Sequence, residues 1–221
     1  MGRFLNSHDI SEKIPTLLSP VAAAYGRRLE RFGQTPRGVF WRGKEWQTRR
    51  FDILTKIFNQ TDLEGNIRIH DFGCGYGALF DYLADHQAMR ESRYLGTDIS
   101  KDMIDAAKCR ISDPRAHFIQ HLWPTESADF TLVSGTFNMK MDANAEMWRA
   151  YVKSCIKELW KYTTRGLAFN LLASSSSPKY EGLFYVQPED FLCFTQENMD
   201  PNAQLFIESP LPDFTIFARR R

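Results

Sequence analysis

The fold of this chain is decided by twelve residues that pass from an apolar segment into a glycine-rich turn: Ile67-Arg68-Ile69-His70-Asp71-Phe72-Gly73-Cys74-Gly75-Tyr76-Gly77-Ala78. Apolar and polar residues alternate up to Asp71, and this alternation is typical of a β-strand. The segment from Ala78 to about His86 then has the pattern of a helix. A strand, a glycine-rich turn and a helix in this order predict the first unit of a nucleotide-binding α/β sheet.

The glycines of the turn each have a physical reason to be there. One glycine permits a tight turn, one lets the backbone approach a ligand closely, and one lets the next helix pack against the strand. Their spacing, Gly73-x-Gly75-x-Gly77, differs from the G-x-G-x-x-G pattern of dinucleotide-binding folds. The turn by itself therefore indicates a nucleotide-type ligand without naming it.

Composition and charge limit the classes of protein to which the chain can belong. Its 221 residues are 43% hydrophobic and 25% charged, which fits one soluble α/β domain with some added segments. The formal net charge of +1 gives no overall field that favours nucleic acid or a membrane surface. Because no window of about 18 apolar residues exists, no membrane span is expected. The expected partner is a small-molecule substrate, with no nucleic acid and no membrane.

The cysteines and the first residues indicate the compartment. None of the four cysteines forms a C-x-x-C pair, so zinc and thioredoxin-like chemistry are not expected, and no metal site is predicted. Residues Met1 to Asn6 lack the long apolar core of a signal peptide. A reducing, cytoplasmic location is therefore expected.

The part of the chain before the glycine-rich turn is expected to be helical. Pro15 and Pro20 break the first segment of this region. Helices are predicted over Val21 to Phe32 and Trp41 to Phe58. No linker demands a second folding unit, so residues 1–65 are expected to form an N-terminal helical extension or lid on a domain of residues 66–221.

From residue 67 onward, strand patterns alternate with helix patterns. Strands are predicted over Ile67 to Asp71, Arg93 to Ile99, Ala116 to Gln120, Asp129 to Ser134, Gly166 to Leu172, Ala203 to Glu208 and Phe214 to Arg219. Further helices are predicted from a cap at Ser100 to about Arg110, over Asp142 to Tyr162 and over Pro188 to Asn198. This order predicts an α/β, Rossmann-like, doubly wound sheet of seven strands, mixed in direction because a hairpin ends the chain.

The order of these parts resembles the class I S-adenosylmethionine (SAM)-dependent methyltransferase family. The resemblance covers about residues 67–220 and rests on several motifs taken together. These are His70 to Gly77, Gly96-Thr97-Asp98-Ile99-Ser100 with Met103 to Lys108, the strand Asp129 to Ser134, and the closing hairpin. Together they are specific for the fold and for SAM as ligand, and they do not identify the methyl acceptor.

The resemblance implies a cofactor site along the ends of the first two strands. The turn Gly73-Cys74-Gly75-Tyr76-Gly77 would pass under the methionine and ribose parts of SAM, and Asp71 would lie near the methionine ammonium group. Asp98 would accept hydrogen bonds from both ribose hydroxyls, and Ile99 would pack on the adenine ring. An acid about 20 residues past the glycine turn is also the recurrent ribose partner in such sheets on physical grounds.

The chain departs from the family pattern in two places. After the third predicted strand, where the family often has an acid that reads the adenine amino group, the sequence is Gln120-His121-Leu122-Trp123, so His121 or Trp123 could face the adenine. After the fourth, the sequence is Ser134-Gly135-Thr136-Phe137-Asn138 instead of the Asp/Asn-Pro-Pro-aromatic motif of amino-directed nucleic-acid methyltransferases. The missing prolines argue against that class of acceptor, and Gly135 is counted with the cofactor site.

Candidate catalytic residues follow from position in the chain. Phe137 and Asn138 come just after a strand, where α/β sheets bind their ligands, and Tyr180 and Tyr185 follow the fifth strand. Each could equally be a packing residue. On the second predicted helix, Trp41, Gln47 and Arg50 form either a solvated face or a lid over SAM, and an arginine there could meet the SAM carboxylate or an acidic substrate.

Three functions remain open from the sequence. The first is a SAM-dependent methyltransferase that acts on a small-molecule acceptor, without an obvious general base. The second is a SAM-consuming cyclase or lyase on the same fold, in which an internal nucleophile releases methylthioadenosine, as in azetidine-2-carboxylate formation. The third is a non-catalytic SAM-fold binding protein, against which the intact cofactor motif argues.

Overall fold

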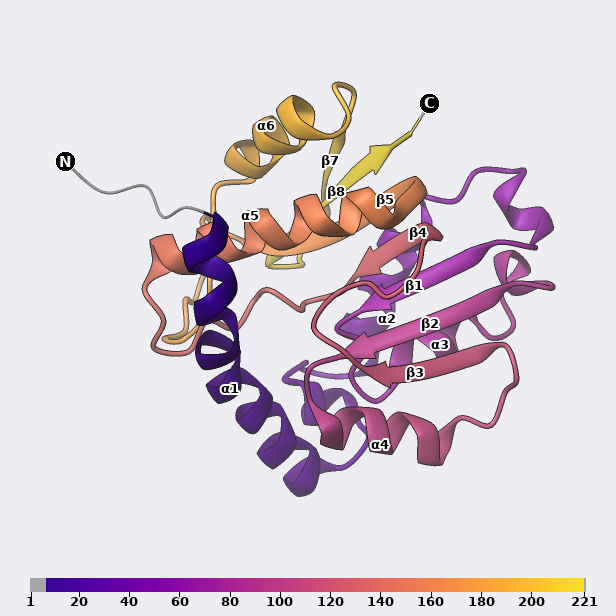
Figure 1. Ribbon diagram of the computed structural model, residues 1–221, viewed down its shortest axis with the longest axis horizontal. Coiled ribbons are helices and arrows are strands. Elements are labelled where there is room, and N and C mark those ends of the chain that lie inside the picture. The colour runs from indigo at the N-terminus through magenta and orange to yellow at the C-terminus, as the bar shows by residue number, and fades with distance from the viewer. Residues whose placement is uncertain (1–6, 221) are drawn as a thin grey trace.

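A single sheet with helices on both faces organises the computed structural model, which describes residues 7–220 and their side chains from residue 14 (Figure 1). The expectation about a signal peptide concerns residues 1–6, which lie outside the described part. The strands are β1 (Arg68–Phe72), β2 (Arg93–Asp98), β3 (Ala116–Gln120), β4 (Ala128–Val133), β5 (Thr163–Ala173), β6 (Tyr185–Val186), β7 (Gln204–Ile207) and β8 (Asp213–Arg219). The α-helices are α1 (Ser7–Phe32), α2 (Lys44–Thr55), α3 (Ala78–Leu83), α4 (Lys101–Arg110), α5 (Ala145–Tyr162) and α6 (Pro188–Asn198).

The strand order is β3-β2-β1-β4-β5-β8-β7, and only β8 runs antiparallel to its neighbours. The Rossmann-like, doubly wound fold that the sequence predicts is therefore confirmed. An eighth strand, β6, was not predicted; it has two residues and pairs with the end of β5. A two-residue strand is too short to show the alternation by which strands are recognised in a sequence.

Two apolar layers fill the space between the sheet and its helices. One layer contains the buried faces of α1, α5 and α6, and the other contains those of α2, α3 and α4. The alternation of β5 places Leu167 and Phe169 in the first layer and Ala168 in the second. Both layers include residues from before position 65, and the division of the chain at residue 65 stays a prediction.

The first helix differs from the sequence prediction. Instead of breaking at Pro15 and Pro20, α1 runs as one helix of 26 residues from Ser7 to Phe32. A proline removes one backbone hydrogen bond and strains its turn. Here the packing of buried Ile14, Leu18 and Val21 against the α5 layer holds the helix together across both prolines.

Other boundaries differ by a few residues. The second helix begins at Lys44 and ends at Thr55, so Trp41 lies in the preceding turn and not on the helix. The predicted cap of α4 is confirmed, because the Ser100 side chain accepts a hydrogen bond from the Met103 N–H. A second cap, Asn144, starts α5 by accepting from Glu146 and Met147.

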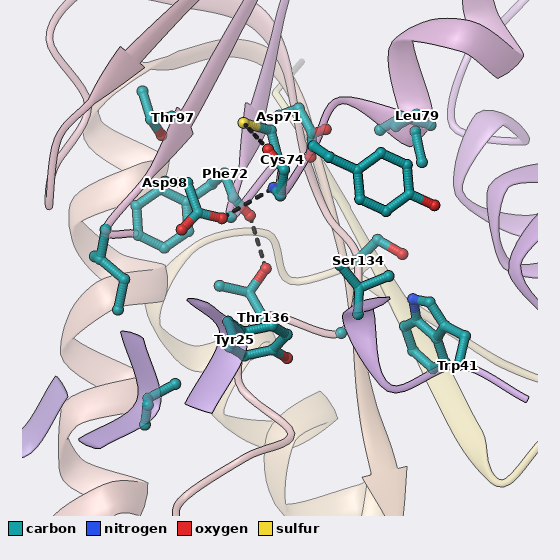
Figure 2. A pocket seen from close by; sticks show the side chains of 18 of the residues that line it. Tyr25, Trp41, Asp71, Phe72, Cys74, Leu79, Thr97, Asp98, Ser134 and Thr136 are labelled. Atoms are coloured by element: carbon teal, nitrogen blue, oxygen red, sulfur yellow. Dashed lines mark hydrogen bonds between the residues drawn. The ribbon is translucent and has the colours of Figure 1, made fainter. Parts of the chain in front are cut away.

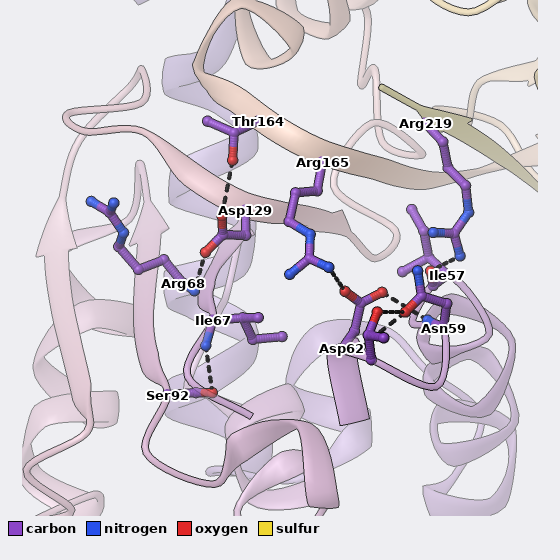
Figure 3. Close-up of polar contacts among 11 residues, drawn as sticks. Ile57, Asn59, Asp62, Ile67, Arg68, Ser92, Asp129, Thr164, Arg165 and Arg219 are labelled. Atoms are coloured by element: carbon purple, nitrogen blue, oxygen red, sulfur yellow. Dashed lines mark hydrogen bonds and ion pairs between the residues drawn. The ribbon is translucent and has the colours of Figure 1, made fainter. Parts of the chain in front are cut away.

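Polar side chains join segments of the chain at the end of the sheet where the parallel strands begin (Figure 3). Asp62 has no exposed surface, accepts from the Asn59 N–H at 2.8 Å and pairs with Arg165 on β5. The Asp129 carboxylate on β4 accepts from the Arg68 N–H of β1 at 2.7 Å. These contacts tie β1, β4 and β5 to the loop that precedes β1.

Candidate functional site

A cavity opens at the carboxyl ends of β1, β2 and β4 (Figure 2). Strand β1 lies between β2 and β4. After β1 the chain adds β2 and β3 on one side of β1, and it then crosses to the other side to add β4. Such a switch point is where open α/β sheets bind their ligands. The space, including its open mouth, is about 900 Å³, and it is lined by Leu18, Val21, Tyr25, Val39, Trp41, Gln47, Phe51, Asp71, Phe72, Gly73, Cys74, Gly75, Tyr76, Ala78, Leu79, Thr97, Asp98, Ile99, His121, Ser134, Gly135, Thr136, Trp148 and Tyr151.

The glycine-rich turn forms the floor of the cavity. Gly73, Gly75 and Gly77 all have positive φ, at 79°, 55° and 83°, which side chains rarely adopt. A Cβ at Gly73 would lie 2.3 Å from the hydroxyl oxygen of Thr136, whereas one at Gly75 would meet Val39 at 3.4 Å and the Met103 sulfur at 3.9 Å, which are ordinary contacts. Gly77 does not line the cavity: a Cβ there would meet Ile111 at 2.6 Å, so this glycine allows helix packing.

Asp98 joins the end of β2 to the glycine-rich turn. Its Oδ2 accepts a hydrogen bond from the Gly75 N–H at 2.9 Å, and its Oδ1 accepts from the Ser100 N–H at 2.8 Å. Each carboxylate oxygen can accept a second hydrogen bond, so Asp98 can still accept hydrogen bonds from a ligand in the cavity that it lines. Burial raises the pKa of this carboxyl, while the backbone donors oppose the rise.

Asp71 is the more deeply buried acid, with 2% of its surface exposed. The hydroxyl of Tyr94 on β2 donates a hydrogen bond to its Oδ2. Burial raises the pKa of Asp71 to about 7, although the Tyr94 hydrogen bond opposes this rise. Burial therefore favours the protonated form of this carboxyl, and a cation beside it would favour the ionised form.

Helix α1 crosses the carboxyl ends of the parallel strands and forms one wall of the cavity. The sequence did not assign this helix to the site. Leu18, Val21 and Tyr25 line the cavity from α1, opposite Trp148 and Tyr151 of α5. Their helical spacing marks an apolar face, and the sequence shows no more than that. Only contacts of α1 with both α4 and α5 place this face over the carboxyl ends of the strands.

Of the three residues predicted to form a lid, two line the cavity and one does not. Trp41 and Gln47 line the cavity, and the Trp41 ring covers Gly135 so closely that a Cβ there would lie 2.5 Å from it. Arg50 does not line the cavity. Its Nε and one terminal nitrogen donate to Asp213 at 2.8 and 2.5 Å, and its guanidinium lies 4.1 Å from the centre of the Trp41 ring. Arg50 therefore neutralises Asp213, which leaves no free charge for a cofactor carboxylate.

The four catalytic candidates also lie outside the cavity lining. Phe137 is fully buried in the α5 layer, and its carbonyl oxygen accepts from the Trp148 Nε1–H at 2.9 Å. Asn138 is 7% exposed, and its Oδ1 has no hydrogen-bond partner among the described residues. Tyr180 is 57% exposed, and its N–H donates to the Tyr185 hydroxyl at 3.0 Å. None of these four residues is among those that line the cavity, and their catalytic role stays a prediction.

At the β2–β3 end of the cavity, Ile99 and His121 line the space, and Trp123 does not. The Nδ1 of His121 lies 2.7 Å from the carbonyl oxygen of Trp123. The lining residues that sequence reasoning missed are thus Leu18, Val21, Tyr25, Val39, Phe51, Phe72, Ala78, Leu79, Thr97, Ser134, Thr136, Trp148 and Tyr151.

Two comparisons identify the family. The family described as "Methyltransferase domain" matches residues 70–162. Over 155 residues the chain is 32% identical to Rv1506c of Mycobacterium tuberculosis (strain ATCC 25618 / H37Rv), which is named as a candidate methyltransferase; the match covers 69% of this chain and 92% of that protein. The chain belongs to the class I SAM-dependent methyltransferase family.

The methyltransferase shares its fold with enzymes that were crystallised with SAM. Magnesium protoporphyrin IX methyltransferase from Synechocystis PCC 6803 with bound SAM matches with a TM-score of 0.62 at 14% identity and covers 100% of both chains. Human N-acetylserotonin methyltransferase in complex with SAM matches with a TM-score of 0.55 at 13% identity, over 96% of this chain and 69% of that chain. None of the helices within residues 7–220 combines the length and apolar character that crossing a membrane requires.

The cofactor is SAM, and the lining of the cavity fits its chemistry. SAM carries a sulfonium and an ammonium group, and the lining formed by the described residues includes two acids, Asp71 and Asp98, and no lysine or arginine. Gly75 lines the cavity with backbone alone, which allows a ligand to approach closely, and Ile99 offers an apolar surface.

Replacing Asp71 with asparagine is expected to stabilise the cofactor-free methyltransferase near pH 8 by a few kcal/mol. The folded-state pKa of about 7 lies above the ordinary value of 3.8. Between these values the folded protein keeps a proton that the unfolded chain has released, so this group makes stability fall as the pH rises. Asparagine cannot ionise, and its Oδ1 can still accept from Tyr94.

Urea unfolding of both proteins near pH 5 and near pH 8 measures the effect. The variant should lose much of the stability difference between the two pH values. If the variant and the wild type change equally with pH, another group carries the proton and the account of Asp71 fails.

Proposed function

We propose that this methyltransferase transfers the methyl group of SAM to a small molecule that enters the cavity between α1 and α5. The observation that carries the proposal is that the side chains of α1 and α5 that line the cavity are almost completely shielded from solvent. Leu18, Val21, Trp148 and Tyr151 line the cavity, yet their exposed fractions are only 6%, 3%, 1% and 3%. Walls this enclosed suit a small molecule, whereas a duplex or a folded protein would have to insert a single flipped base or side chain past α1 to reach them.

The binding roles follow from the arrangement of the acids and the glycine-rich turn. Asp98 would bind the ribose hydroxyls with its remaining acceptor capacity, and Asp71 would balance the methionine ammonium. Gly73, Cys74, Gly75 and Tyr76 would form the floor under the cofactor. Ile99 and His121 would flank the adenine, and Gln47, Trp41 and Gly135 would enclose the methionine end. Gly77 supports this floor through packing.

The protein's contribution to the reaction would be orientation and exclusion of water. When bound, SAM supplies an activated methyl group. The acceptor would take this methyl group with its own lone pair, the carbon–sulfur electron pair would stay on sulfur, and any proton on the acceptor atom would leave to water. Burial raises the pKa of the Tyr25 hydroxyl, with a smaller contribution from Asp98, so Tyr25 is no base at neutral pH. The wall formed by α1 and α5 would therefore serve an acceptor that is already nucleophilic.

Two methyltransferases with the same fold support the proposal that the acceptor is a small molecule. The two structural relatives described above are named for magnesium protoporphyrin IX and for N-acetylserotonin, both of which are small molecules. At identities of 14% and 13% they support the size class and not a particular acceptor.

Labelling with methyl-labelled SAM tests the proposal. Purified protein is incubated with labelled SAM and an extract of the source cells that has been divided by ultrafiltration into small molecules and macromolecules. Label is expected in a product of the small-molecule fraction, and the Asp98→Ala variant should not form it. Label that appears only on protein or nucleic acid overturns the proposal. Methylthioadenosine formed from SAM without extract would instead support the cyclase or lyase reading.

A further inference from the structure

We infer that the acceptor compartment of this cavity takes an uncharged molecule with a flat apolar or aromatic body and rejects anionic acceptors. The compartment consists of Leu18, Val21 and Tyr25 from α1 and Trp148 and Tyr151 from α5. The inference rests on the proposed function, because it names the chemical class of the acceptor for the same site.

The first argument is the surface that these residues present. The Trp148 Nε1–H is already donated to the Phe137 carbonyl oxygen at 2.9 Å, so Trp148 offers only its apolar ring. The Tyr151 ring packs against it with 5.1 Å between ring centroids and 54° between ring planes. Leu18 and Val21 supply aliphatic surface from the other side. Aromatic and aliphatic walls bind flat apolar molecules and offer little to replace the hydration of an ionic group.

The second argument is the balance of charge in the cavity. Two lining acids, Asp71 and Asp98, face a space to which the described side chains, those of residues 14–220, contribute no lysine or arginine. Two nearby arginines are paired elsewhere: Arg50 with Asp213, and Arg110 with Asp81 at 2.5 Å. SAM brings one net positive charge, and S-adenosylhomocysteine (SAH) brings none. An anionic acceptor would therefore add a negative charge that no described side chain of the compartment compensates.

The third argument is that the field of Asp98 reaches the acceptor walls. Burial raises the pKa of Tyr25, and the negative charge of Asp98 raises it further. At Tyr151, burial is again the largest cause of a raised pKa, Cys155 adds to it, and Asp98 contributes as well. The same field that disfavours a phenolate on either wall disfavours a bound anion between them.

A matched pair of probes tests the inference without methyl transfer. Naphthalene-2-carboxamide and naphthalene-2-carboxylate have nearly the same size and shape, and they differ by one negative charge. Titration calorimetry on the SAH-loaded protein at neutral pH should show the amide binding about tenfold more tightly than the carboxylate. Equal or tighter binding of the carboxylate overturns the inference, and so does failure of the amide to bind.

A charge placed on the wall should reverse the preference. Val21→Lys puts a cation among the acceptor-facing residues of α1, and the carboxylate probe should then bind more tightly than the amide. Ala23→Lys is the matched control, because Ala23 is exposed on the same helix, and it should keep the wild-type preference. If Val21→Lys folds by circular dichroism and still prefers the amide, the electrostatic argument is wrong. If it does not fold, the wild-type probe pair still decides the question.

Failure of this inference and failure of the proposed function give different results. The probes report on the SAH complex and need no turnover. The labelling experiment reports on the size class of the acceptor, whatever its charge. A labelled anionic small molecule would thus support the proposed function and overturn the inference.

Discussion

Asp98→Ala is expected to weaken SAH binding by about 100-fold or more, as measured by titration calorimetry. The proposed ribose contacts are hydrogen bonds to a charged, half-buried acceptor, and such bonds contribute more than neutral ones. The substitution also frees the Gly75 and Ser100 N–H groups, which Asp98 holds at 2.9 and 2.8 Å. The binding site therefore loses both a contact with the cofactor and the tie that shapes the glycine-rich turn.

Asp105→Ala is the matched control for this prediction. Asp105 is an acid on the adjoining helix α4, its side chain is 56% exposed, and its partner is Lys101 at 2.5 Å. We expect this variant to bind SAH within about twofold of the wild type, since exposed ion pairs contribute little. A folded Asp98→Ala protein with wild-type SAH affinity would remove Asp98 from the cofactor site.

Asp213→Ala is expected to lower the free energy of unfolding by about 3–5 kcal/mol, because it leaves the Arg50 guanidinium buried without a counterion. Both side chains of the pair are 2% exposed, and Arg50 also donates to the Trp46 carbonyl oxygen at 2.6 Å. The pair joins α2 to the first residue of β8. It also holds the cation that stacks on Trp41, so SAH affinity should fall as Trp41 loses its position against Gly135.

The exposed pair Lys56–Glu208 provides the comparison. This pair joins the residue after α2 to the loop between β7 and β8, close to the Arg50–Asp213 pair in the chain. Its Nζ and Oε2 atoms lie 3.4 Å apart, and the two side chains are 53% and 41% exposed. Lys56→Ala should cost less than about 1 kcal/mol in chemical denaturation. The double variant Arg50→Met/Asp213→Leu should recover most of the lost stability, because it removes both buried charges. If Asp213→Ala costs no more than Lys56→Ala, the buried pair does not hold α2 in place.

The centre of the fold could be predicted because its determinants are local. The alternation that ends at Asp71, the spaced glycines and the acid at Asp98 lie within one β-α-β unit. Steric limits on φ dictate where the glycines must stand. The predicted strands accordingly match β1 to β5, β7 and β8 within a few residues. Only the two-residue β6 lacked a pattern that could be recognised.

The acceptor side of the site could not be predicted in the same way. Phe137, Asn138, Tyr180 and Tyr185 were chosen by their place after strands, and the structure puts other side chains at the cavity. Which face of a loop turns inward depends on what packs against it, and the Trp148 hydrogen bond draws Phe137 into the core. Sequence distance does not encode that choice.

By itself, the sequence determined the sheet, the glycine-rich turn and the acids that mark a SAM site, because backbone sterics and short-range patterning specify them. Only the tertiary structure decided that α1 is continuous and covers the cavity, and that Arg50 belongs to Asp213, 163 residues away. Contacts between distant segments depend on burial and charge pairing that form after the layers assemble. The walls that would select the acceptor are built from such contacts.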